Sequence, residues 1–422
     1  MQQYSRFFLN GVALALILLL GNLQAMPGML GSCPTSSTPM HSTEVLVAGG
    51  QNGTWFHTAQ YPRLFKIVLT NPAAARLATF GSQGTIWSGS TNGTEWLISG
   101  WGNDPYGANP PIMIYDSSFS IVYSSSAPNS NSSWYGGDIF ASSYGRHEWL
   151  LSGMGSGELT GIYGNHMTLA TLNGSNFTDL SSMVPNNQVG ILYTNEWNGS
   201  LWLVGGGFRF NGVLFTFNGN KIRDLSTQIP KSVPTFGPVT SLAWNGSSWL
   251  IGGNQFLAIY NGHRFIDMTG ELLKAVGLFY SVNGISWDKE NDEWLLAGGL
   301  PRADIRPSNA WVATLSSNGK TTNLSALLSC YLKSAHSSSI LSANFDNGLW
   351  ALGGYATYGK QISPILLVIS LRFGTVTNFS NALGDTTYVI WVKFSDSNQP
   401  PSYSYPTCVP LNEWRMCDVQ DN

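Results

Sequence analysis

Charged side chains are scarce in this chain. Asp, Glu, Lys and Arg together make up 10% of its 422 residues, and the formal net charge is −3. Ordinary soluble domains contain roughly 25% charged residues. Because the phosphates of a nucleic acid are bound by clustered Lys and Arg, which this sequence lacks, we expect no nucleic-acid partner.

Motifs that serve bound cofactors and activated nucleophiles are also missing. No Gly-x-Gly-x-x-Gly segment stands between a predicted strand and a predicted helix, and no Gly-x-Ser-x-Gly elbow occurs. The six histidines are not paired at metal-ligand spacing. We therefore expect no cofactor and no metal site.

Cysteine occurs only four times, at Cys33, Cys330, Cys408 and Cys417. No Cys-x-x-Cys pair supports zinc binding. In a protein outside the cell, an even number of loop cysteines favours disulfides. Cys408 and Cys417 enclose a short loop and are the expected pair, which leaves Cys33 to pair with Cys330.

A single long apolar run is present at residues 11–20, and it follows the basic Arg6. This arrangement is typical of a signal peptide over residues 1–25. The run is too short for an ordinary membrane span of about 20 residues. We expect a secreted or cell-surface protein with residues 26–43 as a linker. The only route to a membrane is an uncleaved N-terminal anchor.

The sequence is rich in Asn-x-Ser/Thr sequons, the acceptor sites of N-linked glycans in exported proteins. Four of them fall in predicted tight turns, where a glycan would meet solvent. We expect glycosylation at Asn92, Asn173, Asn198 and Asn245. Five further sequons begin at Asn52, Asn131, Asn176, Asn323 and Asn378.

What the chain has in abundance is repetition. An aromatic residue (valine in the first copy), two or three apolar residues and then a glycine or a glycine pair return seven times. The copies begin at Val45, Trp96, Trp149, Trp202, Trp249, Trp294 and Trp350. A period of about 50 residues, built from short apolar strands, indicates a β-propeller. We predict an all-β, seven-bladed β-propeller of four-stranded blades over residues 44–396, with residues 397–422 as a tail.

The fifth copy shows the pattern of one blade most clearly. Its predicted strands a, b, c and d cover residues 239–244, 249–253, 256–260 and 265–269. The Asn-Gly pairs at residues 245–246 and 261–262 predict type I′ hairpin turns. A Ser or Thr that recurs at the end of strand d is expected to cap a helical turn. Residues 270–279 and 325–334 have apolar spacing that suits short helices.

The two ends of the repeat complete one another. The first copy has predicted strands b, c and d at residues 44–50, 65–70 and 76–80, but no strand a before them. Residues 387–394 follow the last strand d and have the character of a strand a. We therefore predict that this C-terminal strand joins the N-terminal blade and closes the ring, which removes the exposed edges of an open sheet.

The glycine pair that ends strand b, a tyrosine in strand c and an aromatic residue in strand d resemble the kelch repeat. The closest match is Gly252-Gly253, Tyr260 and Phe265. The resemblance spans nearly the whole chain, although here a tryptophan opens strand b instead of standing in strand d. It implies the propeller architecture and no particular function. The tryptophans at fixed repeat positions are expected to pack between blades.

Each blade would present its connections on two opposite faces. We name the face of the a–b and c–d turns the turn face, and the face of the b–c and d–a connections the loop face. Long loops on a rigid scaffold usually carry the binding residues, so we expect a ligand on the loop face. Its long segments are residues 51–64, 101–111, 154–166, 207–212, 300–309 and 355–364. The candidate ligand contacts are Trp101, Tyr106, His166, Arg209, Arg302 and Tyr355.

These features predict a secreted or cell-surface binding or adhesion module for a glycan or an extracellular protein. The alternative is an extracellular hydrolase acting on glycans or other polymers. Sialidase-type propellers are similar in size and use an arginine cluster, for which Arg209, Arg302 and Arg306 lie in suitable loops. Three converging arginines, or paired carboxylates about 5 to 10 Å apart, would favour the hydrolase.

Overall fold

The computed structural model describes the chain from residue 44 to residue 394, with gaps. The described residues are 44–51, 60–69, 71–79, 84–102, 111–126, 137–155, 166–185, 189–208, 211–229, 236–299, 309–359, 361–370, 374–384 and 386–394. All of them belong to the compact unit Ser36–Asn422. The predicted signal peptide, linker and C-terminal tail lie outside the described residues.

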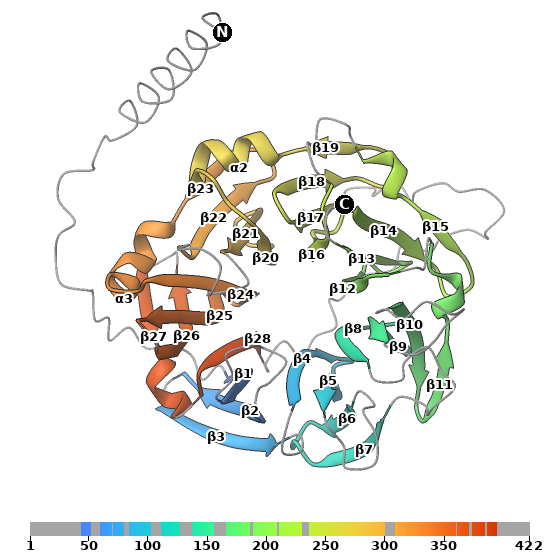
Figure 1. Ribbon diagram of the computed structural model, residues 1–422, viewed down its shortest axis with the longest axis horizontal. Helices are drawn as coiled ribbons and strands as arrows, with labels where there is room; N and C mark the ends of the chain where they lie inside the picture. The colour runs from blue at the N-terminus through green and yellow to red at the C-terminus, as the bar shows by residue number, and fades with distance from the viewer. Residues whose placement is uncertain are drawn as a thin grey trace, which may run out of the picture. The chain divides into compact units, whose positions relative to one another are not determined.

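The described strands form seven four-stranded antiparallel sheets. Figure 1 shows the sheets as the blades of a ring, with strand a of every blade nearest the centre. The predicted seven-bladed β-propeller is therefore confirmed. From strand a to strand d, blade 1 consists of β28 (Tyr388–Phe394), β1 (Glu44–Gln51), β2 (Gln60–Val68) and β3 (Asn71–Thr79). Blade 2 consists of β4 (Gly84–Thr91), β5 (Glu95–Gly102), β6 (Pro111–Asp116) and β7 (Ile121–Ser126). Blade 3 consists of β8 (Asp138–Gly145), β9 (Glu148–Gly155), β10 (His166–Asn173) and β11 (Asn176–Asp179).

Blades 4 and 5 are β12 (Ile191–Trp197), β13 (Trp202–Phe208), β14 (Asn211–Phe217) and β15 (Ile222–Asp224), and β16 (Val239–Trp244), β17 (Trp249–Gly253), β18 (Phe256–Tyr260) and β19 (Phe265–Asp267). Blades 6 and 7 are β20 (Val282–Asp288), β21 (Glu293–Gly298), β22 (Trp311–Ser316) and β23 (Thr321–Asn323), and β24 (Ser337–Asp346), β25 (Leu349–Tyr358), β26 (Gln361–Ser370) and β27 (Thr375–Asn378). In blade 5 the predicted strands a, b and c match the structure residue for residue.

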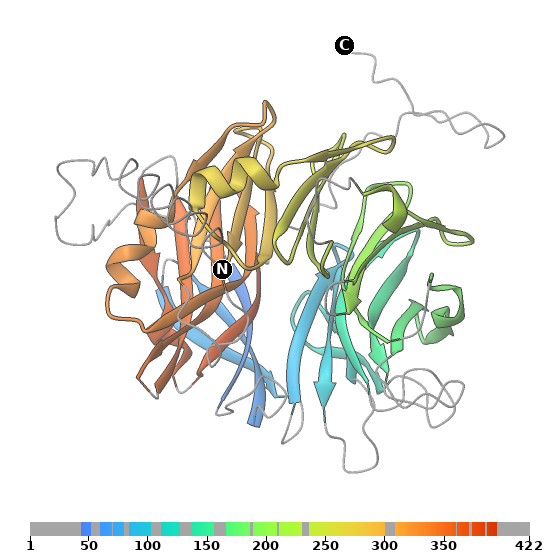
Figure 2. The ribbon, with the colours of Figure 1, turned by 45° about the horizontal axis from the view of Figure 1, so that its top comes forward.

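Short helices follow several of the outer strands. They are η2 (Ser181–Met183), η3 (Ser226–Gln228), α2 (Thr269–Val276), η4 (Ser325–Leu328), α3 (Ser329–Leu332) and η5 (Ser380–Leu383). The predicted helices at residues 270–279 and 325–334 are confirmed by α2 and by η4 with α3. Figures 1 and 2 both show α2 and α3 at the rim of the ring, away from its centre.

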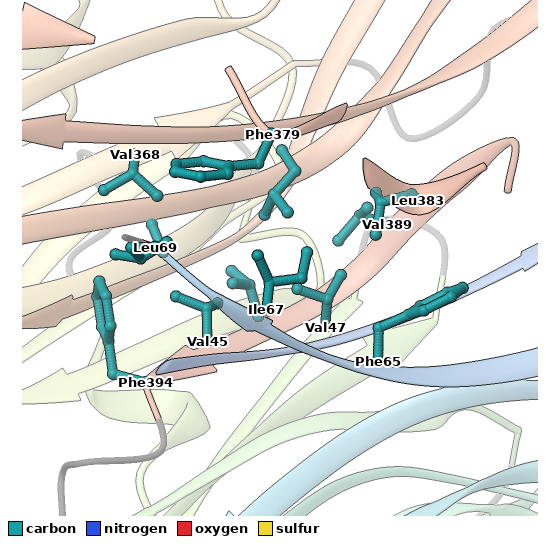
Figure 3. Packing of buried hydrophobic residues seen from close by; sticks show 13 residues of the cluster. Val45, Val47, Phe65, Ile67, Leu69, Val368, Phe379, Leu383, Val389 and Phe394 are labelled. Atoms are coloured by element: carbon teal, nitrogen blue, oxygen red, sulfur yellow. The ribbon is translucent and has the colours of Figure 1, made fainter. Parts of the chain in front are cut away.

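The C-terminal strand closes the ring, as predicted. β28 pairs antiparallel with β1, from Val45 opposite Phe394 to Gly50 opposite Tyr388. Figure 3 shows the core at this junction, where Val389 and Phe394 pack with buried side chains of β1, β2, β26 and η5. Each fully buried aliphatic or phenyl side chain contributes roughly 1.5–3 kcal/mol, so the junction is held by packing as well as by strand pairing.

Strand a carries a β-bulge in every blade. In blade 4, Leu192 pairs with Gly206 and Thr194 pairs with Gly205, so Tyr193 between them has no partner in the ladder. The bulged residues of blades 1 to 7 are Ile390, Trp87, Phe140, Tyr193, Thr240, Asn283 and Leu341. A bulge bends a strand and redirects a side chain, and here it does so once per blade at the same position.

The bulge explains the glycine that ends the repeated phrase. A Cβ atom on Gly206 would collide with the backbone carbonyl of Ile191 in strand a. In every other blade, a Cβ atom on the equivalent glycine would likewise collide with a backbone carbonyl at the start of that blade's strand a. The repeated glycine therefore marks a close approach of two backbones.

The repeated tryptophans are buried between blades, as predicted. Trp202 opens strand b of blade 4 and belongs to one core cluster with Leu150 and Leu169 of blade 3. Its ring also meets that of Trp197 at the end of strand a, with ring centroids 4.4 Å apart. Blades 5, 6 and 7 repeat this aromatic pair. These tryptophans build the core and are not exposed to a carbohydrate.

The Asn-Gly turns do not have the predicted type I′ geometry. In blade 4, Trp197 pairs with Trp202 across four loop residues, and Gly199 alone among the four has a positive φ, of 97°. Asn198 Oδ1 accepts hydrogen bonds from the N–H groups two and three residues further on, at 3.0 and 2.9 Å. The asparagine thus closes the loop as an Asx turn. Asn92, Asn218, Asn245 and Asn261 close their turns in the same way.

The Ser or Thr after strand d also acts differently from the prediction. Ser226 makes no cap hydrogen bond to η3. Its Oγ accepts a hydrogen bond from the N–H of Leu214 on strand c (3.0 Å) and donates one to the carbonyl of the same residue (3.2 Å). Asp224 Oδ1 in turn accepts a hydrogen bond from the N–H of Ser226, at 2.8 Å. Because strand d is short, the hydroxyl takes over the ladder bonds of strand c, and blades 3, 5 and 6 repeat the device.

The predicted loop at residues 355–364 is wrong. β25 continues to Tyr358 and β26 begins at Gln361, with Tyr355 opposite Pro364. The Tyr358 hydroxyl donates a hydrogen bond to the carbonyl of Tyr331 on α3, at 3.3 Å. This tertiary contact, which the local sequence does not encode, supports the extension.

The predicted loop at residues 207–212 is also wrong for the residues that the structure describes there. β13 continues to Phe208 and β14 begins at Asn211, and these two residues pair with one another. In blade 1, β2 and β3 begin several residues before the predicted starts at 65 and 76. β2 pairs with β1 on one side and with β3 on the other, and this pairing extends both strands beyond their apolar segments.

Candidate functional site

The structure describes three of the six predicted ligand contacts. Trp101 and Tyr355 occupy the same position in blades 2 and 7, directly after the glycine that faces the bulge. His166 opens strand c of blade 3. All three lie at the loop-face ends of their strands, but His166 and Tyr355 are buried and do not meet each other. The other three, Tyr106, Arg209 and Arg302, lie outside the described residues.

Tyr355 takes part in an aromatic cluster between blades. It packs with Tyr388 and Ile390 of β28, and partly buried Trp87 and Leu341 lie against the same cluster. Burial raises the pKa of the Tyr388 phenol, opposed in part by a hydrogen bond to a neighbouring threonine. Tyr355 therefore joins blades 7, 1 and 2 from within, and its role here is packing.

Blade 3 holds a buried acid at its loop-face end. Asp138 begins β8, and burial raises its pKa to about 7. A buried carboxyl group with a near-neutral pKa is a common mark of a functional site. However, Asp138 is 1% exposed, so a ligand does not reach it in this structure. The sequence offered no signal for it, because an Asp at the start of a strand is ordinarily a turn residue.

Exposed apolar side chains occur at three positions of the described loop face between blades 4 and 6. Phe208 lies on the b–c hairpin of blade 4, and Leu278 and Tyr280 lie in the connection from α2 to β20. Leu278 is 98% exposed, the largest exposure among the exposed large apolar side chains of the described residues. We name Phe208, Leu278 and Tyr280 the apolar arc.

Backbone hydrogen bonds connect the segments that carry the apolar arc. The N–H of Gly212 donates to the carbonyl of Phe236, and the N–H of Gln255 donates to the carbonyl of Tyr280, both at 2.8 Å. No charged residue occurs at 236–238, 254–256 or 276–284. The connection that carries Leu278 and Tyr280 is thus uncharged and fixed by backbone hydrogen bonds, whereas the charged Arg209 directly follows Phe208. Sequence reasoning included Phe208 in a long segment of the loop face, but it missed Leu278 and Tyr280 because they stand in a short connection.

The predicted glycosylation sites all lie at turns between strands on the turn face. The Oδ1 atoms of Asn198 and Asn245 accept the turn hydrogen bonds, which do not use the amide nitrogen that would carry a glycan. Asn92 additionally donates from Nδ2 to Glu95 Oε2 at 3.0 Å, and Asn173 is exposed at the β10–β11 turn. Glycosylation at the four sites stays a prediction.

The disulfide prediction is also untested. Cys330 lies on α3 with an exposed free thiol, and the described residues contain no disulfide. Its predicted partner Cys33 lies outside them, as do Cys408 and Cys417. In the part of the chain that the structure describes, no three His, Cys, Asp or Glu side chains gather to hold a metal ion. No helix there is long and apolar enough to cross a membrane.

No protein-family model matches the chain, and neither does any curated protein. Among solved structures it is similar to Sqt1 from Chaetomium thermophilum, with 12% identity and a TM-score of 0.44 over 72% of this chain and 74% of that one. A putative 6-phosphogluconolactonase from Bacteroides uniformis gives 9% identity and a TM-score of 0.49 over 84% and 100%. The β-propeller domain of the Trilobed protease from Pyrococcus furiosus gives 12% and 0.39 over 63% and 74%. We derive no function from these similarities.

Proposed function

We propose that this chain is a secreted or cell-surface binding module with kelch-like blades, which engages a protein partner through the apolar arc of its loop face. The observation that supports it best is the full exposure of Leu278 beside Tyr280 in a neutral connection fixed by backbone hydrogen bonds. Burial of Leu278 alone would contribute roughly 2 kcal/mol to binding. Large apolar and aromatic anchors of this kind supply most of the free energy at protein interfaces.

The partner can be sought by photo-crosslinking from the arc. A photoreactive amino acid replaces Leu278 in the full chain, and Ile266 serves as the matched control position because it is exposed on the outer strand β19. In cells that produce the protein, we expect a discrete protein adduct from position 278 and none from position 266. The same pattern of adducts from both positions would contradict the proposal.

The affinity of the recovered partner then tests the arc directly. We expect Ile266→Ser to bind it like the wild type and Leu278→Ser to bind at least tenfold more weakly, a loss of about 1.4 kcal/mol. Both side chains are exposed, so neither change should disturb folding. Equal binding by the two variants would overturn the role of the arc. If the wild type binds a glycan on an array and Leu278→Ser does not, the partner of the arc is a glycan and not a protein.

Export has its own test. N-terminal sequencing of protein from the culture medium or the cell surface should begin near Met26. Protein found only inside the cell, with its N-terminus at Met1, would contradict the secreted assignment.

The hydrolase alternative requires an acid that a substrate can reach. Asp138 has a suitably raised pKa but is buried inside blade 3, and the candidate arginines Arg209, Arg302 and Arg306 lie outside the described residues. We therefore keep binding as the preferred proposal. If the protein hydrolyses a glycan polymer, and Asp138→Asn abolishes this activity while Leu278→Ser keeps it, the hydrolase would be preferred instead.

A further inference from the structure

Seven strands a surround the centre of the ring (Figure 1), and their common register sorts their residues into layers. The bulged residues form one layer. Trp87 stacks on Phe140 with centroids 4.9 Å apart, and Phe140 meets Tyr193 edge-on at 5.5 Å. Ile390 packs with Trp87 and Leu341. Large apolar side chains from blades 7, 1, 2, 3 and 4 therefore form a nearly continuous apolar layer at the bulges.

A second layer lies three residues further along each strand a, toward the turn face. In five blades its residues are small: Ser90, Ser143, Ala243, Ser286 and Asn344. Four of them bind the next blade. Ser90 Oγ shares a hydrogen bond with Ser142 Oγ at 2.8 Å, and Ser143 Oγ donates one to Asn195 Oδ1 at 2.5 Å. Ser286 Oγ accepts a hydrogen bond from the N–H of Phe345 at 2.8 Å, and Asn344 Oδ1 accepts one from the N–H of Phe394 at 3.0 Å.

The other two blades place opposite charges in the second layer. Glu196 belongs to strand a of blade 4, and Lys393 belongs to strand a of blade 1. Both are partly exposed although they stand on innermost strands, so solvent reaches them. Within the described residues, neither side chain has a hydrogen-bond partner or an oppositely charged group within the ion-pair limit of 4.0 Å.

The two charges nevertheless influence one another. Burial raises the pKa of Glu196 to about 7, and the attraction of Lys393 opposes that rise. Burial lowers the pKa of Lys393, and the attraction of Glu196 opposes that fall. The pair thus interacts through space without a direct contact, and each charge remains only partly compensated.

We propose that Glu196 and Lys393 bind a small zwitterionic ligand of the α-amino-acid class at the centre of the ring. The ammonium group of the ligand faces the Glu196 carboxylate, and its carboxylate faces the Lys393 ammonium. An enclosed charge without a direct partner costs free energy, and a zwitterion offsets both costs at once. A simple anion or cation would satisfy one charge and repel the other. This site is separate from the apolar arc and goes beyond the proposed function, because it lies toward the opposite face.

Ligand controls test the charge requirement. Purified full-length protein is titrated with free L-α-amino acids, one at a time, and heat release and thermal unfolding are measured. A ligand that binds the folded state raises the unfolding temperature by mass action. We expect at least one free amino acid to do so, and its N-acetyl derivative and its amide, which each keep one charge, not to do so. Stabilisation by the singly charged derivatives, or by no amino acid at all, would overturn the proposal.

Variants test the two residues. Glu196→Gln and Lys393→Met remove one charge each at similar size, and we expect each to weaken binding at least tenfold. Glu271→Gln is the matched control, because Glu271 pairs with Lys274 on exposed α2, at 2.6 Å. The double variant E196Q/K393M leaves no uncompensated charge, so it should fold even where a single variant does not. Amino-acid binding retained by the double variant would refute the site.

Discussion

Replacement of Gly206 by alanine tests the link between the repeated glycine and the bulge of strand a. The new Cβ would collide with the carbonyl of Ile191 and lie 2.7 Å from the Cα of Leu192. Both obstacles are backbone atoms of a paired strand, so no side chain can rotate away to make space. Either β12 must move or the bulge at Tyr193 must rearrange.

The expected cost follows from this geometry. Overpacking of a core costs typically 1–3 kcal/mol, and a backbone obstacle lies at the upper end, so we expect about 3 kcal/mol for Gly206→Ala. The entropy of unfolding is about 2.1 cal/mol/K per residue, or about 0.7 kcal/mol/K for roughly 350 residues. The unfolding temperature should therefore fall by roughly 4 °C.

Gly270→Ala is the matched control. A Cβ there meets no heavy atom within 4 Å, and the residue is exposed on α2. Alanine favours a helix by up to about 1 kcal/mol over glycine, so this variant should unfold about 1 °C higher than the wild type. Circular dichroism and calorimetry measure both shifts. If Gly206→Ala unfolds at or above the wild-type temperature, the bulge does not require the glycine and the reasoning fails.

Four further outcomes are expected. Truncation before Thr387 removes strand a of blade 1 and should abolish cooperative unfolding, so an unchanged melting curve would refute the closure. Ser181→Ala leaves two strand-c backbone groups without their hydroxyl partner and should cost about 1–3 kcal/mol, measured by denaturant unfolding. Burial raises the folded-state pKa of Asp138 from 3.8 to about 7. The unfolding free energy should therefore fall as the pH rises from about 4 to about 7, and Asp138→Asn should not show this fall. Mapping of non-reduced peptides should find Cys408 bonded to Cys417, and alkylation of Cys408 in freshly secreted protein would contradict this.

Most of the fold could be predicted from local patterns. The strands of blade 5 match from residue 239 to residue 260, because alternating apolar residues stand between Asn-Gly turns that stop them. The count of blades followed from the repeat. Closure followed from one missing strand and one surplus strand, since an unpaired edge is costly.

The predicted sites fared differently, because position in sequence says little about burial. Tyr355 was chosen as part of a long loop, yet β25 and β26 continue through it and neighbouring blades cover it. Leu278 stands in a short connection that sequence alone gives no reason to prefer, and it is fully exposed. His166 was chosen as the end of a long loop, yet it opens β10 and is buried by packing.

The sequence by itself determined the repeat, the number of blades and the positions of the buried tryptophans, because period and apolar alternation are local properties. Only the tertiary structure decided the register of strand a against strand b, and with it the seven bulges. It also decided that Glu196 and Lys393, far apart in the chain, share one layer around the centre of the ring. A bulge depends on two backbones meeting at a glycine, and a layer depends on closing the ring, so neither can be read from any single segment.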